Sequence, residues 1–294
     1  MSETNDVPGR SPGGPGATGS EPTPREPVPV RVDWPDGDDV ALRVGVGACR
    51  LRLRPGSPEA FVLGSYDDPT GTLPLSTSTE YGEVRLSQQT RLSEVRSFRA
   101  GVPTLDLALG TGRRFALSVA TGASEVHLEL GSLSLRRVAV RLGAGSAEIA
   151  FSSPAVGELE RFDCEAGAAA VTLRGLGFAS PEQATVVGGA ASYDLSFDGP
   201  LRRDVTARVT TAGASVVLRV PAASAARVGV VSVLAGLSVR DGFSTWEDSF
   251  WTRAGVDGVR PRLSVDASIT LGSLELVAAE GGVVEPPGIE PGSQ

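Results

Sequence analysis

The 294-residue chain contains no lysine, so all 27 of its basic side chains are arginines. The absence of lysine excludes enzymes that form a Schiff base and sites in which a lysine holds phosphate. Histidine is also scarce, because His127 is the only one. Aromatic residues make up 5% of the chain. This composition leaves few side chains for nucleophilic, redox or metal chemistry.

Cysteines and long hydrophobic runs are scarce as well. Cys49 and Cys164 are the only cysteines, which is too few for a disulfide scaffold in a chain of this length. The first residues show no basic stretch followed by an apolar run, so we expect no secretory signal. The longest apolar stretch, 228–239, is interrupted by Ser and Gly and is too short to span a bilayer. We therefore expect a soluble, cytoplasmic chain.

The formal net charge of −8 limits the kinds of partner that the chain is expected to bind. An acidic surface repels the phosphate backbone of nucleic acids and the head groups of anionic lipids. We therefore expect no nucleic-acid partner and no membrane span.

Proline and glycine mark the two ends of the chain. Residues 1–30 and 281–294 are rich in both and cannot bury enough apolar surface to offset their ordering entropy, so we predict disordered tails there. Between them, residues 31–118 are less regular and are predicted to form the N-terminal strands or cap. Residues 119–280 are predicted to form the regular part of the fold.

The folded part alternates apolar and polar residues, as in RLRLR, TLDLAL and EVHLEL. This alternation between Gly-rich breaks is typical of short β-strands. From Gly122 on, small residues recur at spacings of 22 to 24 with a final spacing of 36, and Gly47 fits the same template. A sharp bend favours a small residue, and glycine where φ is positive, so we interpret them as corners between two strands of a repeat. The predicted corners are Gly47, Gly122, Gly145, Gly167, Gly189, Ala212, Gly236 and Gly272.

A repeat of this length predicts an all-β parallel β-solenoid with coils of about 22–24 residues, because a propeller blade needs about 40 or more. Stacked coils align equivalent residues about 4.8 Å apart and close one continuous core. The alternative is a β-sandwich, which also has closely spaced strands but gives no reason for the same columns to recur.

The segments GVGACRLRLRPG, AFVLGSYDD, TGASEVHLEL and GAGSAEIAF resemble the bacterial toast-rack domain of LiaF-type cell-wall-active antibiotic response regulators and related adhesin-like proteins. The resemblance covers residues 38–280. It implies a β-solenoid that acts in regulation or interaction at the bacterial envelope, with no known catalysis. LiaF-type proteins usually carry transmembrane helices ahead of this domain, where this chain has a Pro/Gly-rich tail. The resemblance transfers no functional residue, because its motif is a fold motif.

Four groups of residues are candidates for chemistry. His127 shares an outward strand face with Glu125 and Glu129, where a solvated strand face is favoured over a metal site because no second His or outward Cys completes one. Cys49 and Cys164 are expected to point inward as small hydrophobes.

The third group comprises Asp33, Asp36, Asp38 and Asp39, whose spacing differs from a calcium loop and favours a polar turn. The fourth comprises the outward acids, which are scattered instead of paired for glycan cleavage; these are Glu125, Glu129, Glu148, Asp194 and Glu275. We predict no catalytic residue, no metal and no cofactor.

An aromatic insertion at 240–262 accounts for the long final spacing. It holds Phe243, Trp246, Phe250 and Trp251. We favour a cap that covers the apolar end of the solenoid, and the alternative is a partner-binding surface, because Trp is enriched at binding hot spots.

The leading functional hypothesis is a non-enzymatic scaffold or regulatory interaction protein with a protein partner, linked to the cell-envelope stress response. One alternative is a carbohydrate-binding or carbohydrate-processing β-helix. Another is a self-assembling solenoid that associates through uncapped ends.

Overall fold

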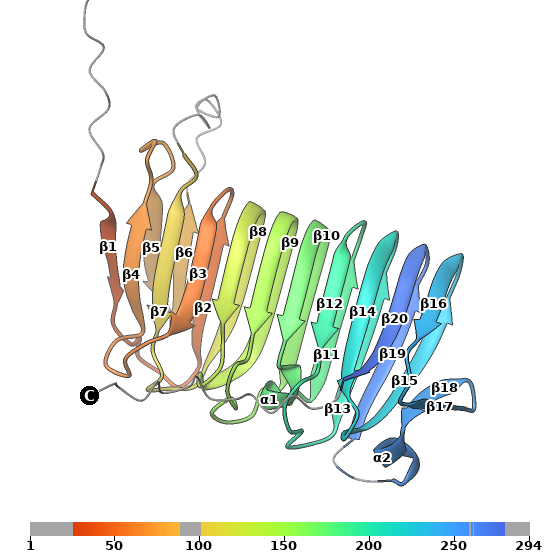
Figure 1. Ribbon diagram of the computed structural model, residues 1–294. Coiled ribbons are helices and arrows are strands. Elements are labelled where there is room, and N and C mark those ends of the chain that lie inside the picture. The colour runs from red at the N-terminus through yellow and green to blue at the C-terminus, as the bar shows by residue number, and fades with distance from the viewer. Residues whose placement is uncertain (1–25, 89–100, 259, 261, 280–294) are drawn as a thin grey trace, which may run out of the picture.

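The computed structural model describes residues 26–88, 101–258, 260 and 262–279. Its regular structure is almost entirely β-strand, in one long sheet that folds over into two facing layers (Figure 1). The two helices, α1 (Leu176–Ala179) and α2 (Arg253–Val256), have four residues each. Over the described ranges, no helix has the length and apolar character needed to cross a membrane. Most of the two predicted tails lies outside the described residues. Residues 26–30 are described, and 28–30 belong to the first strand, β1 (Val28–Val32).

Three central coils show the design of the fold. Each is a single long strand that runs up one layer, bends at the corner and returns down the other; these are β8 (Phe115–Glu129), β9 (Leu135–Ala150) and β10 (Arg161–Arg174). Adjacent coils pair in parallel, with Val119 beside Val140 and Val140 beside Cys164. This parallel stacking confirms the β-solenoid and excludes the β-sandwich.

The layers differ in which half of each coil they contain. The first layer holds, in spatial order, β5 (Leu75–Glu80), β6 (Glu83–Gln88), β2 (Val40–Val46), the first halves of β8 to β10, β11 (Gln183–Gly188), β13 (Val205–Thr211), β19 (Arg262–Ile269), β15 (Ala225–Ser232), β18 (Ser249–Thr252) and β17 (Phe243–Trp246). The second layer holds β1 (Val28–Val32), β4 (Val62–Asp67), β7 (Thr104–Leu109), β3 (Arg50–Pro55), the second halves of β8 to β10, β12 (Ser192–Ser196), β14 (Ala214–Pro221), β20 (Gly272–Ala279) and β16 (Ala235–Val239).

The coils at both ends are interleaved. The coil of β2 and β3 lies between the coil of β6 and β7 and that of β8, although it comes first in the sequence. The coil of β19 and β20 lies between that of β13 and β14 and that of β15 and β16 (Figure 1). The coils at both ends are therefore not stacked in simple sequence order.

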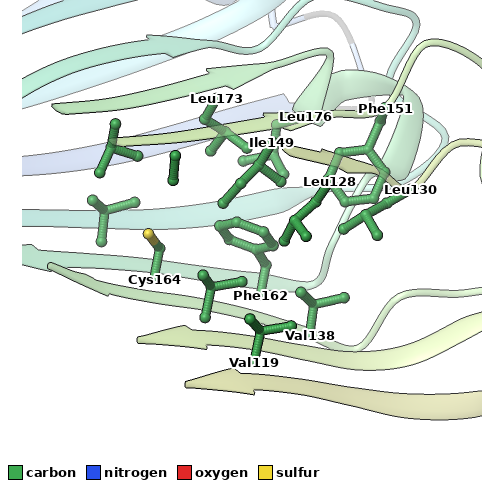
Figure 2. Close-up of a cluster of buried hydrophobic side chains, with 14 of the residues drawn as sticks. Val119, Leu128, Leu130, Val138, Ile149, Phe151, Phe162, Cys164, Leu173 and Leu176 are labelled. Atoms are coloured by element: carbon green, nitrogen blue, oxygen red, sulfur yellow. The ribbon is translucent and has the colours of Figure 1, made fainter. Parts of the chain in front are cut away.

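The core lies between the two layers. Val119, Phe162 and Cys164 of the first layer face Ile149 and Leu173 of the second, and all are buried (Figure 2). Inward side chains alternate with outward ones along each strand, as the burial pattern of β10 shows. Both cysteines are buried, which confirms the inward orientation predicted for them.

The corner is a stack of small residues whose backbones approach closely. A Cβ atom on Gly122 would lie 2.4 Å from the carbonyl oxygen of Gly47, and one on Gly189 would lie 2.9 Å from that of Gly167. The register continues this column to Ala212, since Gly188 pairs with Thr211. Five of the predicted corners therefore occupy one column.

The other three predicted corners do not belong to that column. Gly145 pairs with Ser124, and Gly272 pairs with Ala214, so both lie two positions further along their coils. Gly236 pairs with Ser273, one position further still. Spacing alone misaligned these coils, because the chain carries several small residues around each corner. Gly143, whose added Cβ would meet the carbonyl oxygen of Gly122 at 2.8 Å, occupies the position predicted for Gly145.

Candidate functional site: a groove on the outer face of the first layer

The outer face of the first layer carries a cluster of charged residues over the central coils. Strand alternation turns Arg137 and Arg141 of β9 outward on either side of Ala139. On the next coil it turns Asp163 and Glu165 of β10 outward. The regular parallel register holds these side chains in adjacent rows.

These side chains line a groove. A depression of about 290 Å³ is bordered by the three arginines Arg137, Arg141 and Arg161, and by Val187 of β11. A second depression, of about 390 Å³, continues toward the corner glycines and shares Arg141 with the first. Because Ala139 is small, it leaves space between the longer side chains around it. We call this continuous feature the β9–β11 groove.

Ion pairs neutralise most of the charge in the β9–β11 groove. Arg141 Nε lies 3.0 Å from a carboxylate oxygen of Glu165, and Arg161 Nε lies 2.7 Å from one of Asp163. The hydrogen bond from Arg161 to Asp163 raises the pKa of the guanidinium further above its ordinary value. Across the described chain, Arg137 has no ion pair or side-chain hydrogen bond, so no acidic side chain there neutralises its charge. Val187 adds an apolar contact, since its side chain is 43% exposed.

His127 lies on the outer face of the second layer. Its Nε2 is 3.8 Å from a carboxylate oxygen of Glu148, which also pairs with Arg174 at 2.8 Å. Glu125 pairs with Arg50 instead, and the hydrogen bond from that guanidinium lowers the pKa of Glu125. The three residues Glu125, His127 and Glu129 therefore share a face, as predicted, but each has its own partners.

Each of the remaining outward acids also has hydrogen-bond partners of its own. Asp194 receives two hydrogen bonds from Arg219, at 2.9 and 3.2 Å, and Glu275 receives one from Arg240 at 2.7 Å. Glu129 accepts hydrogen bonds from two backbone amides. Each of these carboxylates is satisfied locally, so none is positioned with a second acid as an acid–base pair.

The aspartate cluster lies in the segment between β1 and β2. Asp33 pairs with Arg31 at 3.3 Å, and Asp39 pairs with Arg136. Within the described ranges, no three His, Cys, Asp or Glu side chains converge on a point that could hold a metal ion.

Burial is the main cause of the raised pKa values of the titratable groups in the core. It raises the pKa of Cys49 and that of Cys164 to about 12. It also raises the pKa of Tyr66 and that of Tyr193 to about 12. These groups stay protonated at neutral pH and serve as packing residues.

The aromatic insertion forms a hairpin at one end of the solenoid. β18 pairs antiparallel with β15, and β17 pairs antiparallel with β18. Phe243 and Phe250 pack against the core, whereas Trp246 is 56% exposed and lies against Trp251 with ring centroids 5.8 Å apart. The hairpin therefore covers the edge of the first layer and leaves one tryptophan in solvent.

The alternation of apolar and polar residues alone does not predict the β9–β11 groove. Its signal is the segment RRVAVRL, in which Arg137 and Arg141 fall on the polar phase of the alternation around a small Ala139. Which outward residues lie beside them depends on the coil register, and the spacing placed this coil two positions out of register.

Comparison with known families gives one match. The family model Toast_rack_N, described as the N-terminal domain of toast_rack, DUF2154, matches residues 28–174. This range is half of the chain and runs from the start of β1 to the end of β10. It includes the β9 and β10 side chains of the β9–β11 groove. No curated protein matches the sequence.

Several solved structures are similar to this chain. A protein from Clostridium sporogenes described as a "putative cell adhesion protein" has a TM-score of 0.45 and 11% identity, covering 86% of this chain and 100% of its own. A "putative adhesin" from Bacteroides fragilis has a TM-score of 0.41 and 8% identity, covering 86% and 96%. A "putative lipid binding protein" from Parabacteroides distasonis has a TM-score of 0.37 and 11% identity, also covering 86% and 96%.

Proposed function

The chain belongs to the family of the toast_rack N-terminal domain, and we propose that it is a non-enzymatic scaffold or regulatory interaction protein that binds a protein partner through the β9–β11 groove. The resemblance to LiaF-type regulators supports a link to the cell-envelope stress response. In this proposal the protein acts in the cytoplasm, where its two free cysteines stay reduced.

The observation that carries the proposal is the uncompensated charge of Arg137 in the same groove as an exposed apolar residue. A planar guanidinium binds a carboxylate through two parallel hydrogen bonds, and Arg is enriched at protein interfaces. Val187 offers an apolar contact on β11, which is separated from the strand of Arg137 by β10. The partner segment that fits carries an acidic side chain for Arg137 and, further along the groove, an apolar one for Val187.

A non-enzymatic role is supported by the state of the titratable groups. Catalytic acids and bases need pKa values near the working pH and a geometry that brings them together. The largest pKa shifts in the described chain belong to cysteines and tyrosines buried in the core. The outward carboxylates that we considered for glycan cleavage are each held by an arginine or by backbone amides.

The test is an affinity capture from the native host with the purified chain as bait. Arg137→Glu reverses the charge at the end of the groove away from the corner and should abolish retention of the partner. The matched control is Arg208→Glu, an exposed arginine on the outer face of the same layer that does not line the groove.

Both variants should melt at the wild-type temperature, since exposed substitutions change stability little. A partner that both variants retain equally would contradict the groove as the binding site. Turnover of a glycan by the purified wild-type chain would contradict the non-enzymatic role itself.

A further inference from the structure

The β9–β11 groove changes in chemistry along the direction of its strands. At the end away from the corner it is lined by Arg137 and Arg161. At the corner end its two charged residues, Arg141 and Glu165, form an ion pair, and the rest of the lining is Val187 together with small or buried residues. The groove therefore has a basic end and an apolar end.

Two guanidinium groups lie in neighbouring rows at the basic end. Arg137 of β9 and Arg161 of β10 are in register on adjacent parallel strands, and like charges in such positions repel each other. Among the described residues, Arg161 donates to the carboxylate of Asp163 through Nε alone, so its terminal nitrogens still have hydrogens to donate. A ligand carboxylate between the two guanidinium groups accepts hydrogen bonds from both and relieves their repulsion.

The charge of the groove fits a carboxylate better than a phosphate. The lining holds three arginines and two acidic side chains, which gives a net charge of +1 in a chain whose formal charge is −8. One carboxylate neutralises this charge. A phosphate group carries about −1.5 to −2 charges at pH 7 and exceeds it.

The apolar end offers a contact surface for one large side chain. Val187 is 43% exposed there, and the glycines at the corners of β9 and β10 carry no side chain that would obstruct an approach. Tyr193 is buried and fills the space that a side chain on Gly188 would occupy, so the floor of the groove is closed. An aliphatic or aromatic ligand side chain that packs on Val187 removes apolar surface of both from water.

The strand register sets the distance between the two ends. Arg161 pairs with Gln183, and Glu165 pairs with Val187, so the row of Arg161 and the row of Val187 are four residues apart along the strands. Four residues of a β-strand rise by about 13 Å. Val187 also lies one strand to the side of Arg161, about 4.8 Å away in that direction, which side chains can reach across.

An extended segment matches this distance with residues that are four positions apart. Its rise per residue is that of the strands below it, and an even separation places both side chains on the same side. In a helix, residues four positions apart rise by only about 6 Å and do not span the groove. The residue midway between them lies over Ala139, whose small side chain leaves room for it.

We propose that the β9–β11 groove binds an extended segment of the partner protein in which an aspartate or glutamate and a large apolar residue are four positions apart. The carboxylate lies between Arg137 and Arg161, and the apolar side chain packs on Val187. This assignment rests on the binding role proposed above for the groove.

The first test compares two peptides of the same composition as ligands of the full chain. The probes are acetyl-TETTTLT-amide, in which the glutamate and the leucine are four positions apart, and acetyl-TELTTTT-amide, in which they are adjacent. Threonine favours an extended backbone, and the blocked ends carry no terminal charge. In an NMR titration of the isotope-labelled chain, the first peptide should shift the amide signals of β9 to β11 and bind about tenfold more tightly than the second.

The second test removes the contacts at each end of the groove. Arg137→Gln and Val187→Ser should each weaken binding of acetyl-TETTTLT-amide about tenfold, because each deletes the contact at one end. Arg208→Gln is the control, since Arg208 is an exposed arginine on the same layer that does not line the groove, and it should leave the affinity unchanged. A third peptide, with phosphothreonine in place of the glutamate, should bind no more tightly than the first.

Equal affinities of the two peptides of matched composition would overturn the spacing. Tighter binding of the phosphothreonine peptide would overturn the carboxylate, and signal shifts confined to strands outside β9 to β11 would overturn the site. If neither peptide binds while retention of the host partner still depends on Arg137, the spacing fails and the proposed function stands. If Arg137→Glu retains that partner as the wild type does, both fail, because both require this guanidinium.

Discussion

Gly122→Ala tests whether the glycine column at the corner is required by close packing between coils. In the native structure an added Cβ would lie 2.4 Å from the carbonyl oxygen of Gly47, where real Cβ contacts essentially never fall below 3.0 Å. The obstacle is backbone held by parallel hydrogen bonds, so relief requires the two coils to separate locally. Overpacking of this kind costs about 1–3 kcal/mol.

The control is Gly45→Ala, in β2 of the coil next to Gly122. Its added Cβ would meet nothing closer than 4.0 Å, and its φ is not positive. This change should be neutral or slightly stabilising, because alanine restricts the unfolded chain.

Thermal unfolding followed by circular dichroism measures both variants. Gly122→Ala should lower Tm by roughly 2–12 °C, given about 2–4 °C per kcal/mol for a domain of this size. Equal melting temperatures for the two alanine variants would refute the close-approach argument, since only the space around the Cβ distinguishes them.

Three further predictions concern the core and the C-terminal hairpin. Cys164→Ser should lower the free energy of unfolding by roughly 1–3 kcal/mol, because it places a hydroxyl in an apolar column; chemical denaturation that shows no loss would contradict the buried position. Burial raises the pKa of the Cys164 thiol from 9.0 to about 12, so the stability that the protonated thiol contributes is complete below about pH 9 and is lost as the pH rises toward 12. The Tm of Cys164→Ala should therefore fall less steeply at alkaline pH than that of the wild type, and identical profiles of Tm against pH would contradict the raised pKa. Thr252→Val removes a hydroxyl that donates to Ser224 O at 2.6 Å and accepts from Ala226 N at 2.9 Å. Backbone hydrogen exchange should therefore become faster in β18 while β8 to β10 stay protected, and unchanged exchange in β18 would show that this hydroxyl does not stabilise the hairpin.

Much of the fold follows from the sequence. The alternation and the recurring small residues predict stacked parallel coils, and the register places Cys164, Val186 and Val209, each three positions before a predicted corner, in one column. These residues are predictable because each inward position must be apolar in every coil.

Register at the ends could not be obtained in the same way. If Gly236 were a corner, the spacing would place Arg240 in the inward column of Val216 and Leu274, whereas the residue in that column is Leu237, three positions earlier. Several small residues cluster near each corner, and any of them satisfies the pattern. Only hydrogen bonds between coils distinguish the choices, and these depend on which coils are neighbours.

The neighbours of the end coils are themselves hidden from a linear reading. The spacing of 36 between Gly236 and Gly272 signals an insertion but does not say that the last coil lies between the two coils that precede it in the sequence. The same limit applies to the β9–β11 groove, because its depth depends on Ala139 lying between the side chains of adjacent coils.

The interleaved end coils have a mechanical consequence. In a solenoid stacked in sequence order, a force on the C-terminus can unzip the last coil from one neighbour and then proceed coil by coil. Here the last strand, β20, is flanked by β14 on one side and β16 on the other. A pull at Ala279 must shear two parallel ladders at the same time, and β2 and β3 present the same obstacle at the other end. The fold therefore resists unravelling at its C-terminal coil, and it does so at the N-terminal end once β1, which pairs only with β4 among the described strands, has detached.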